Sequence, residues 1–148
     1  MKQHRIPMKP VDLSNNLKSL LLQRFEWFES RQLETMNRSG IQQLTLAQGR
    51  IFAQLRGKDL SISDLAKRLG VSRQAAQKTV AGLVEMGLLE LRESEGNMSV
   101  KIVHITDAGH RFRTEIGRAM SKIEAQVAEK IGKEGLAQLK HLLTQHWD

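Results

Sequence analysis

The sequence contains no cysteine, no tyrosine and only two prolines among its 148 residues. The lack of cysteine excludes disulfides, thiol nucleophiles and thiolate-ligated zinc sites. The scarcity of proline, together with the missing tyrosine, argues against a turn-rich β-sandwich. Hydrophobic residues make up 40% of the chain and charged residues 26%. These proportions are typical of a single globular domain and rule out a disordered or collagen-like chain.

Long apolar runs are also missing. No stretch approaches the roughly 18 uncharged apolar residues that a membrane-spanning helix needs. The first residues, Met1-Lys2-Gln3-His4-Arg5, are not followed by the apolar core of a signal peptide. We therefore expect a cytoplasmic protein without a membrane partner.

Positive charge is plentiful and unevenly distributed. The formal net charge is +7, and residues 38–82 hold eight Lys or Arg against two Asp or Glu. Residues 83–105 hold two Lys or Arg against four Asp or Glu. A cluster of like charge is often only a solvated face, so its meaning depends on the elements that carry it.

Long amphipathic helices are expected at both ends of the chain. Apolar residues recur at helical spacing from about Val11 to Asn37, and again from Phe112 to Ile131. After an interruption at Gly132, a last helix continues the apolar stripe to Trp147. Because these stripes are larger than a small helical lobe can cover, they predict dimerisation.

A shorter helix is announced by Thr45 and Gln48, which form a capping-box pattern. Its apolar face is expected to consist of Ile51, Phe52 and Leu55, and Gly57 is expected to end it.

Two further helices follow at close spacing. Ser61 caps the first, which ends at Gly70 after barely two turns. Ser72 caps the second, which runs from Arg73 to Met86 and ends at Gly87, where a left-handed residue is favoured. A short helix, a turn containing glycine and a longer helix are typical of a helix-turn-helix.

The period then changes to that of a β-hairpin. Residues Leu88 to Arg92 and Met98 to Ile105 are rich in apolar side chains, and Ser94-Glu95-Gly96-Asn97 supplies the turn. The fold class predicted is mostly α with a small β-hairpin wing. We expect residues 1–148 to form one domain, in which a winged helix-turn-helix lobe (41–109) lies between two parts of a helical dimerisation region (1–40 and 110–148).

The sequence contains no pattern that indicates an enzyme active site. The sequence has no nucleophile elbow, no phosphate-binding loop and no dinucleotide-binding glycine pattern, and its histidines lack zinc-site spacing. His104 and His110 lie near the end of the hairpin and could approach each other, whereas Glu93 and Glu95 lie at its tip, where both are solvated. We expect no catalytic residues, no metal and no cofactor.

The exposed face of the helix after Ser72 is a stronger candidate for a functional site than any of these enzymatic patterns. Ala76, Val80 and Leu83 recur at spacings of four and three, so they form its buried face. The opposite face presents Arg73, Gln74, Gln77, Lys78 and Ala81. An α-helix fits the major groove of DNA, where Arg and Lys donate to guanine or phosphate and Gln bonds adenine. A merely solvated helix would carry similar residues, but Lys67 and Arg68 add to the charge of the same two-helix unit.

Four ordered motifs resemble the MarR family of bacterial transcriptional regulators, over about residues 44–109. They are Leu44-Thr45-Leu46-Ala47-Gln48, Ile62-Ser63-Asp64-Leu65-Ala66-Lys67-Arg68-Leu69-Gly70-Val71-Ser72, Leu83-Val84-Glu85-Met86-Gly87-Leu88-Leu89, and Ile105-Thr106-Asp107-Ala108-Gly109. The resemblance implies a homodimeric repressor on a palindromic double-stranded DNA operator. It also implies a small aromatic or anionic effector that binds between the dimerisation region and the lobe and releases the DNA.

The predicted DNA-binding residues fall into two groups. The helix supplies Ser72, Arg73, Gln74, Gln77 and Lys78, and the wing supplies Arg92, Asn97, Ser99 and Lys101.

Two positions depart from the family pattern. Relatives commonly carry Asp-Arg-Arg near the wing tip, where this chain has Asn97-Met98-Ser99, so the arginine that enters the minor groove is missing. Glu90, Glu93 and Glu95 also make this wing net negative. Gly49 stands where relatives often place an aromatic residue, a change that reshapes or removes the usual ligand pocket.

A second class of function is a non-enzymatic helical interaction module, dimeric, that uses its basic face on a protein or membrane surface. Against it, the basic excess falls on the helix-turn-helix and not on an amphipathic helix that bears Trp or Phe.

Overall fold

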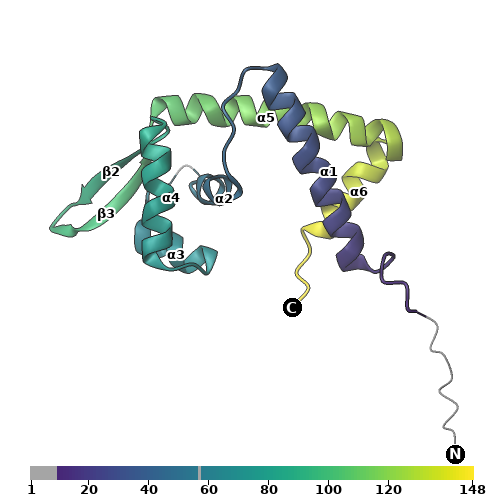
Figure 1. Ribbon diagram of the computed structural model, residues 1–148, viewed down its shortest axis with the longest axis horizontal. Coiled ribbons are helices and arrows are strands. Elements are labelled where there is room, and N and C mark those ends of the chain that lie inside the picture. Colours follow the sequence, from purple (N-terminus) through teal and green to yellow (C-terminus); the bar gives the residue numbers. More distant parts are fainter. Residues whose placement is uncertain (1–9, 57) are drawn as a thin grey trace, which may run out of the picture.

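The computed structural model describes residues 10–56 and 58–148 (Figure 1). The predicted helix end at Gly57 and the N-terminal residues Met1 to Arg5 lie outside the described residues. The elements are, in order, α1 (Leu17–Arg38), α2 (Leu46–Gln54), β1 (Leu60–Ser61), α3 (Ile62–Leu69), α4 (Arg73–Glu85), β2 (Leu89–Ser94), β3 (Asn97–Ile105), α5 (Asp107–Ile131) and α6 (Lys133–Leu143). The prediction of a mostly helical chain with a small hairpin wing is confirmed.

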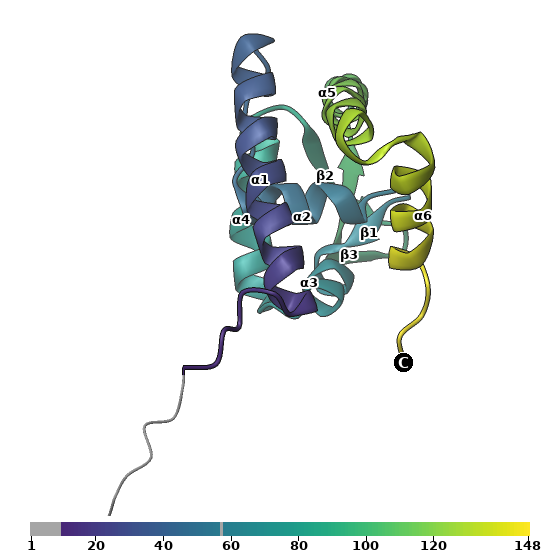
Figure 2. The ribbon, with the colours of Figure 1, turned by 90° about the vertical axis from the view of Figure 1, so that its right-hand side faces the viewer.

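The molecule has two ends joined by α5. At one end, α2, α3, α4 and the sheet form a lobe, and α5 runs from this lobe to the other end, where α1 and α6 lie (Figure 1). Turned by 90°, the ribbon places α1 and α6 on opposite sides of α5 (Figure 2). The two terminal helices, which we call the arms, lie at the end away from the hairpin (Figure 1), although Met36 in the last turns of α1 belongs to the same buried cluster as residues of the lobe.

Local capping explains where the helices of the lobe begin. Thr45 Oγ1 accepts from the backbone N–H of Gln48 at 3.2 Å, and the Gln48 side chain accepts from the N–H of Thr45 at 3.0 Å. Ser61 and Ser72 each accept from the backbone N–H three residues on, at 3.1 and 3.0 Å. These bonds satisfy N–H groups that the first helical turn leaves free.

Several predicted boundaries were wrong. The first helix begins at Leu17 and not at Val11, because Asn16 is its N-cap and accepts from the N–H of Ser19 at 3.0 Å. The last helix ends at Leu143, so Trp147 lies beyond it. Ser94 and Asn97 belong to the strands, which leaves Glu95 and Gly96 as the turn.

The sheet has three antiparallel strands in the order β1-β3-β2. The short β1 was not predicted, and its Leu60 pairs with Val103 of β3. Two residues are too few for a sequence pattern, and their pairing with β3 joins segments more than forty residues apart. β1 thus ties the start of α3 to the hairpin.

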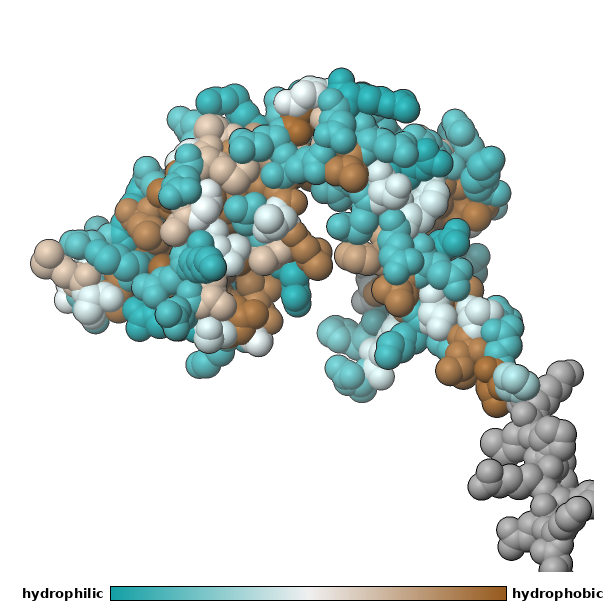
Figure 3. Space-filling model, in the orientation of Figure 1, coloured by the Kyte–Doolittle hydropathy of each residue, from teal (hydrophilic) through white to brown (hydrophobic). Residues whose placement is uncertain are grey.

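The hydrophobic core lies in the lobe. Leu55, Leu65, Val80, Leu83 and Val103 are fully buried there, and Phe112 extends this core onto the beginning of α5. By contrast, most apolar side chains of α1 and α6 are exposed, and they gather where α1 begins (Figure 3). In the part of the chain that is described, no helix combines the length and the apolar character that crossing a membrane requires.

Candidate nucleic-acid interface

The helix-turn-helix is built by α3, a tight turn and α4. Gly70 ends α3 with φ +64°, a left-handed conformation that side chains disfavour, and its N–H bonds back to α3 carbonyls. The turn brings Leu65 and Ala66 of α3 into the same buried cluster as Val80 of α4. The inward face of α4 is therefore fixed by packing.

The opposite face of α4 is solvent-exposed. Ser72 and the four predicted contact residues Arg73, Gln74, Gln77 and Lys78 are all exposed, as is Ala81. Lys67 and Arg68 project from the last turn of α3. Among the described residues, none of the four cations has an ion-pair partner. This surface, which we call the basic face (Lys67, Arg68, Arg73 and Lys78), is free to bind an anion.

The wing is the hairpin of β2 and β3, which extends from the lobe beside α4 (Figure 1). Its strand register changes near the tip: Glu93 pairs with Lys101, whereas Ser94 pairs with Asn97. Three residues of β3 therefore bulge out between these pairs, and among them Met98 is 73% exposed. Asn97 Oδ1 accepts from the N–H and the hydroxyl of Ser99, at 3.1 and 2.6 Å. The predicted wing residues Asn97 and Ser99 thus bond to each other.

Both predicted cations of the wing are paired with glutamates. Lys101 Nζ lies 3.0 Å from Glu93 Oε1 across the strands. Arg92 forms an ion pair with Glu90 on the same strand. Within the described residues, the structure thus separates the predicted site into an unpaired basic face on the helices and a wing whose positive charges are already matched.

Of the two histidines near the hairpin, His104 has a polar partner in a distant segment. Its Nδ1 lies 2.8 Å from Asp59 Oδ1, in the segment before β1. No local sequence pattern indicates this pair, because its members are 45 positions apart.

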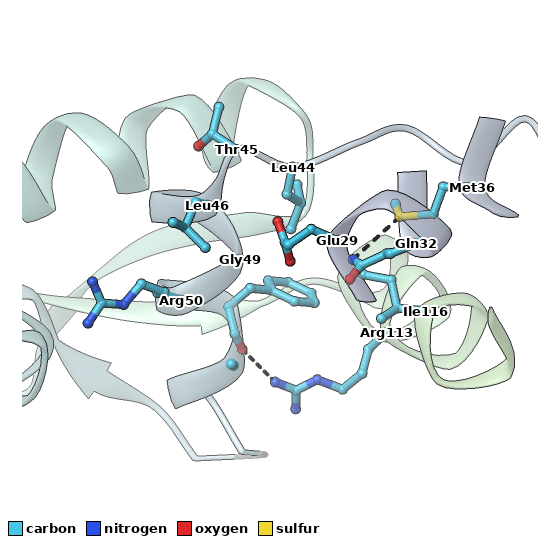
Figure 4. Close-up of a pocket in the computed structure, with 12 residues that line it drawn as sticks. Glu29, Gln32, Met36, Leu44, Thr45, Leu46, Gly49, Arg50, Arg113 and Ile116 are labelled. Atoms are coloured by element: carbon cyan, nitrogen blue, oxygen red, sulfur yellow. Dashed lines mark hydrogen bonds between the residues drawn. The ribbon is translucent and has the colours of Figure 1, made fainter. Parts of the chain in front are cut away.

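A cavity of about 310 Å³ lies between α1, α2 and α5 (Figure 4). Its apolar lining includes Met36, Leu44, Phe52 and Ile116. Leu46 adds a further apolar side chain, and polar and small residues complete the lining, namely Glu29, Gln32, Thr45, Gly49, Arg50, Ala53 and Arg113. A Cβ placed on Gly49 would meet nothing within 4 Å. The glycine noted in the sequence therefore opens the pocket and does not remove it.

Arg113, which lines this cavity, is held by two contacts with Phe52. Its Nη2 donates to the Phe52 carbonyl at 2.7 Å, as Figure 4 shows, and its guanidinium lies 5.2 Å from the centre of the Phe52 ring. The Phe52 ring in turn packs edge-on against Phe112. Sequence reasoning missed Arg113 and Arg50, since no local pattern marks a cavity between three helices.

Comparisons with known proteins agree with this geometry. Residues 42–97, which include α2, α3, α4, β2 and the turn of the wing, match the model of the MarR family. The HTH-type transcriptional regulator TcaR of Staphylococcus aureus is 22% identical over 103 residues, covering 68% of each chain.

Solved structures share the fold over most of the chain. Transcriptional regulator PA4135 is 26% identical with a TM-score of 0.67, covering 86% of this chain and 93% of the other. A cysteine-to-serine mutant of MarR from E. coli, complexed with operator DNA, is 19% identical with a TM-score of 0.69, covering 90% and 96%. The motif order, the winged lobe and these matches agree: residues 42–97 match the MarR family, and the chain is similar in fold to solved winged helix-turn-helix regulators over most of its length.

Proposed function

We propose that this protein is a homodimeric repressor that binds a palindromic DNA operator through α4. The observation that carries the proposal is the basic face, whose four cations have no ion-pair partner in the described residues. Unpaired cations attract the phosphates of DNA, and an exposed helix fits the width of the DNA major groove. The operator DNA bound by the similar MarR mutant supports the same choice.

Within this proposal, different residues of α4 contact the bases and the backbone of the DNA. Gln74 and Gln77 reach base edges, because they lie opposite the buried face of the helix. Arg73 and Lys78 contact bases or phosphates, and Ser72 contacts the backbone at the start of the helix. The wing residues Arg92, Asn97, Ser99 and Lys101 contribute weaker contacts along the adjacent backbone.

Dimerisation is supported by the apolar arms. Leu17 on α1 is 60% exposed and Leu142 on α6 is 54% exposed, and neither belongs to the core of the lobe. A second copy that covers these side chains would remove them from water and place two lobes on one DNA. Residues 1–40 and 110–148 then form the dimerisation region, and residues 41–109 form the DNA-binding lobe.

The cavity is the proposed effector site. Arg113 lies in the cavity beside apolar walls, an arrangement that suits a small aromatic acid. Arg50 lines this cavity and also a second one of about 120 Å³ between α2, the turn after α3, and α4. A ligand that displaces Arg50 or shifts α2 would therefore disturb the support of α4.

Replacing Leu17 or Leu142 by Glu should dissociate the dimer. A charge buried at the interface without a partner should weaken association at least about 100-fold. Sedimentation equilibrium at micromolar concentration should shift from a dimer towards the 16.8 kDa monomer. Gln42→Glu, the control, adds the same charge at an exposed position outside residues 1–40 and 110–148. An unmodified protein that sediments as a monomer would exclude the dimer.

DNA binding should depend strongly on salt. The basic faces of two subunits can neutralise about six to ten phosphates, so affinity should fall by roughly 10³ to 10⁵ between 50 and 200 mM salt. Filter binding on random duplex DNA measures this dependence. A log–log slope near zero would favour the alternative of a protein or membrane interaction module.

Gln74→Ala should weaken binding to the operator selectively. Loss of a bidentate base contact costs about 1 to 3 kcal/mol on the cognate sequence and little on random DNA. The control is Gln126→Ala, an exposed glutamine on α5. Equal losses on both DNAs would assign Gln74 to the phosphate backbone.

Gly49→Phe should fill the cavity and abolish effector binding. With benzoate as the probe, calorimetry should detect binding to the unmodified protein and binding at least about tenfold weaker in the variant, because the added ring occupies the space. Gly117→Phe is the control, since Gly117 is also helical, has open space around it and lies outside the cavity lining. Unchanged benzoate affinity in Gly49→Phe would place the site elsewhere.

A further inference from the structure

The two predicted cations of the wing, Arg92 and Lys101, form ion pairs, unlike the cations of the basic face. Lys101 faces Glu93 directly in the register of the sheet, and the two side chains are 40% and 46% exposed. Arg92 is paired with Glu90, again near the surface. All four groups lie on β2 and β3, so both pairs form within the hairpin itself.

The basic face has no such internal partners. In the described ranges, the ion pairs of the chain involve none of its four cations. Asp64 is the one acidic residue between Ile62 and Glu85, and it forms no ion pair with Lys67 or Arg68, which follow it three and four positions later on α3. The two halves of the lobe therefore present different charges to a polyanion.

A glutamate that is paired with a cation of the wing competes with a DNA phosphate for that cation. Exposed ion pairs are weak and exchange easily, so a DNA phosphate can take Lys101 from Glu93. The exchange leaves the Glu93 carboxylate unpaired beside the negatively charged backbone, which reduces the gain from the new contact. Glu95 in the turn adds further negative charge but holds no cation among the residues that the structure describes.

We infer that Glu93 limits the affinity of this protein for DNA by holding Lys101, with Glu90 acting in the same way on Arg92. This inference rests on the proposed function, because it concerns the same DNA interface. It assigns the wing glutamates a role as residues that set binding strength. The wing then serves as a weak, adjustable contact, whereas α4 provides the main one.

A double-mutant cycle on Glu93 and Lys101 tests the inference. Glu93→Gln keeps the shape of the side chain and removes its charge, which frees Lys101 for a phosphate. Affinity for random duplex DNA at 100 mM salt should rise about two- to fivefold per wing, the equivalent of one surface ion pair. The log–log salt slope should steepen by about 0.9 for each wing that gains a phosphate contact.

The second half of the cycle tests whether the effect of Glu93 on DNA affinity depends on Lys101. In a Lys101→Gln background, Glu93→Gln should change neither the salt slope nor the affinity beyond the effect of Glu95→Gln. Glu95→Gln is the matched control, because it removes one negative charge from the same hairpin without freeing a cation. Thermal melting of each variant checks that the hairpin and the lobe remain folded.

The outcomes separate the two proposals. Equal gains from Glu93→Gln and Glu95→Gln, or a gain that persists without Lys101, would overturn the inference and leave only a general effect of net charge. Salt-dependent binding by the unmodified protein with no effect of Glu93→Gln overturns the inference and leaves the proposed function standing. If no variant binds duplex DNA at low salt, both proposals are wrong.

Discussion

The burial of one narrow face of α4 determines what the rest of the lobe can do. Ala76, Val80 and Leu83 are at most 1% exposed, and their small or branched side chains bring α4 close to α3 and the core. Because a helix is rigid about its axis, fixing one face also fixes the direction of the opposite face. The exposed residues of α4 that we propose as DNA contacts, from Arg73 to Lys78, are oriented by packing contacts that other residues of the helix make.

Much of this arrangement could be predicted from local sequence. The caps at Thr45, Ser61 and Ser72 and the left-handed Gly70 act within a few residues, so their side-chain chemistry can be identified without knowledge of the fold. The periodicity of α4 then separates its buried face from its exposed face. The family motifs lie in the same region, which is why the fold class and the candidate interface were predicted together.

What could not be predicted depends on contacts between distant segments. Strand β1 exists because Leu60 pairs with Val103, and the bulge near Met98 appears only once the register of β2 and β3 is known. The cavity needs α1, α2 and α5 in place before Arg113 can reach the Phe52 carbonyl. The start of α1 was misplaced for another reason: apolar spacing extends back to Leu13, while the cap at Asn16 determines the boundary.

The continuity of α5 has a mechanical consequence for recognition of DNA. Its 25 residues form one rod about 37 Å long that joins the lobe to the arms. A tilt of about 5° at the arm end would move the lobe by about 3 Å, close to the rise of about 3.4 Å per base pair along a DNA strand. In a dimer, the angle between the two α5 helices would set the distance between the two lobes. That distance would determine which spacing of DNA half-sites both lobes can bind together. A few degrees of tilt are then enough to put one lobe out of step with its half-site.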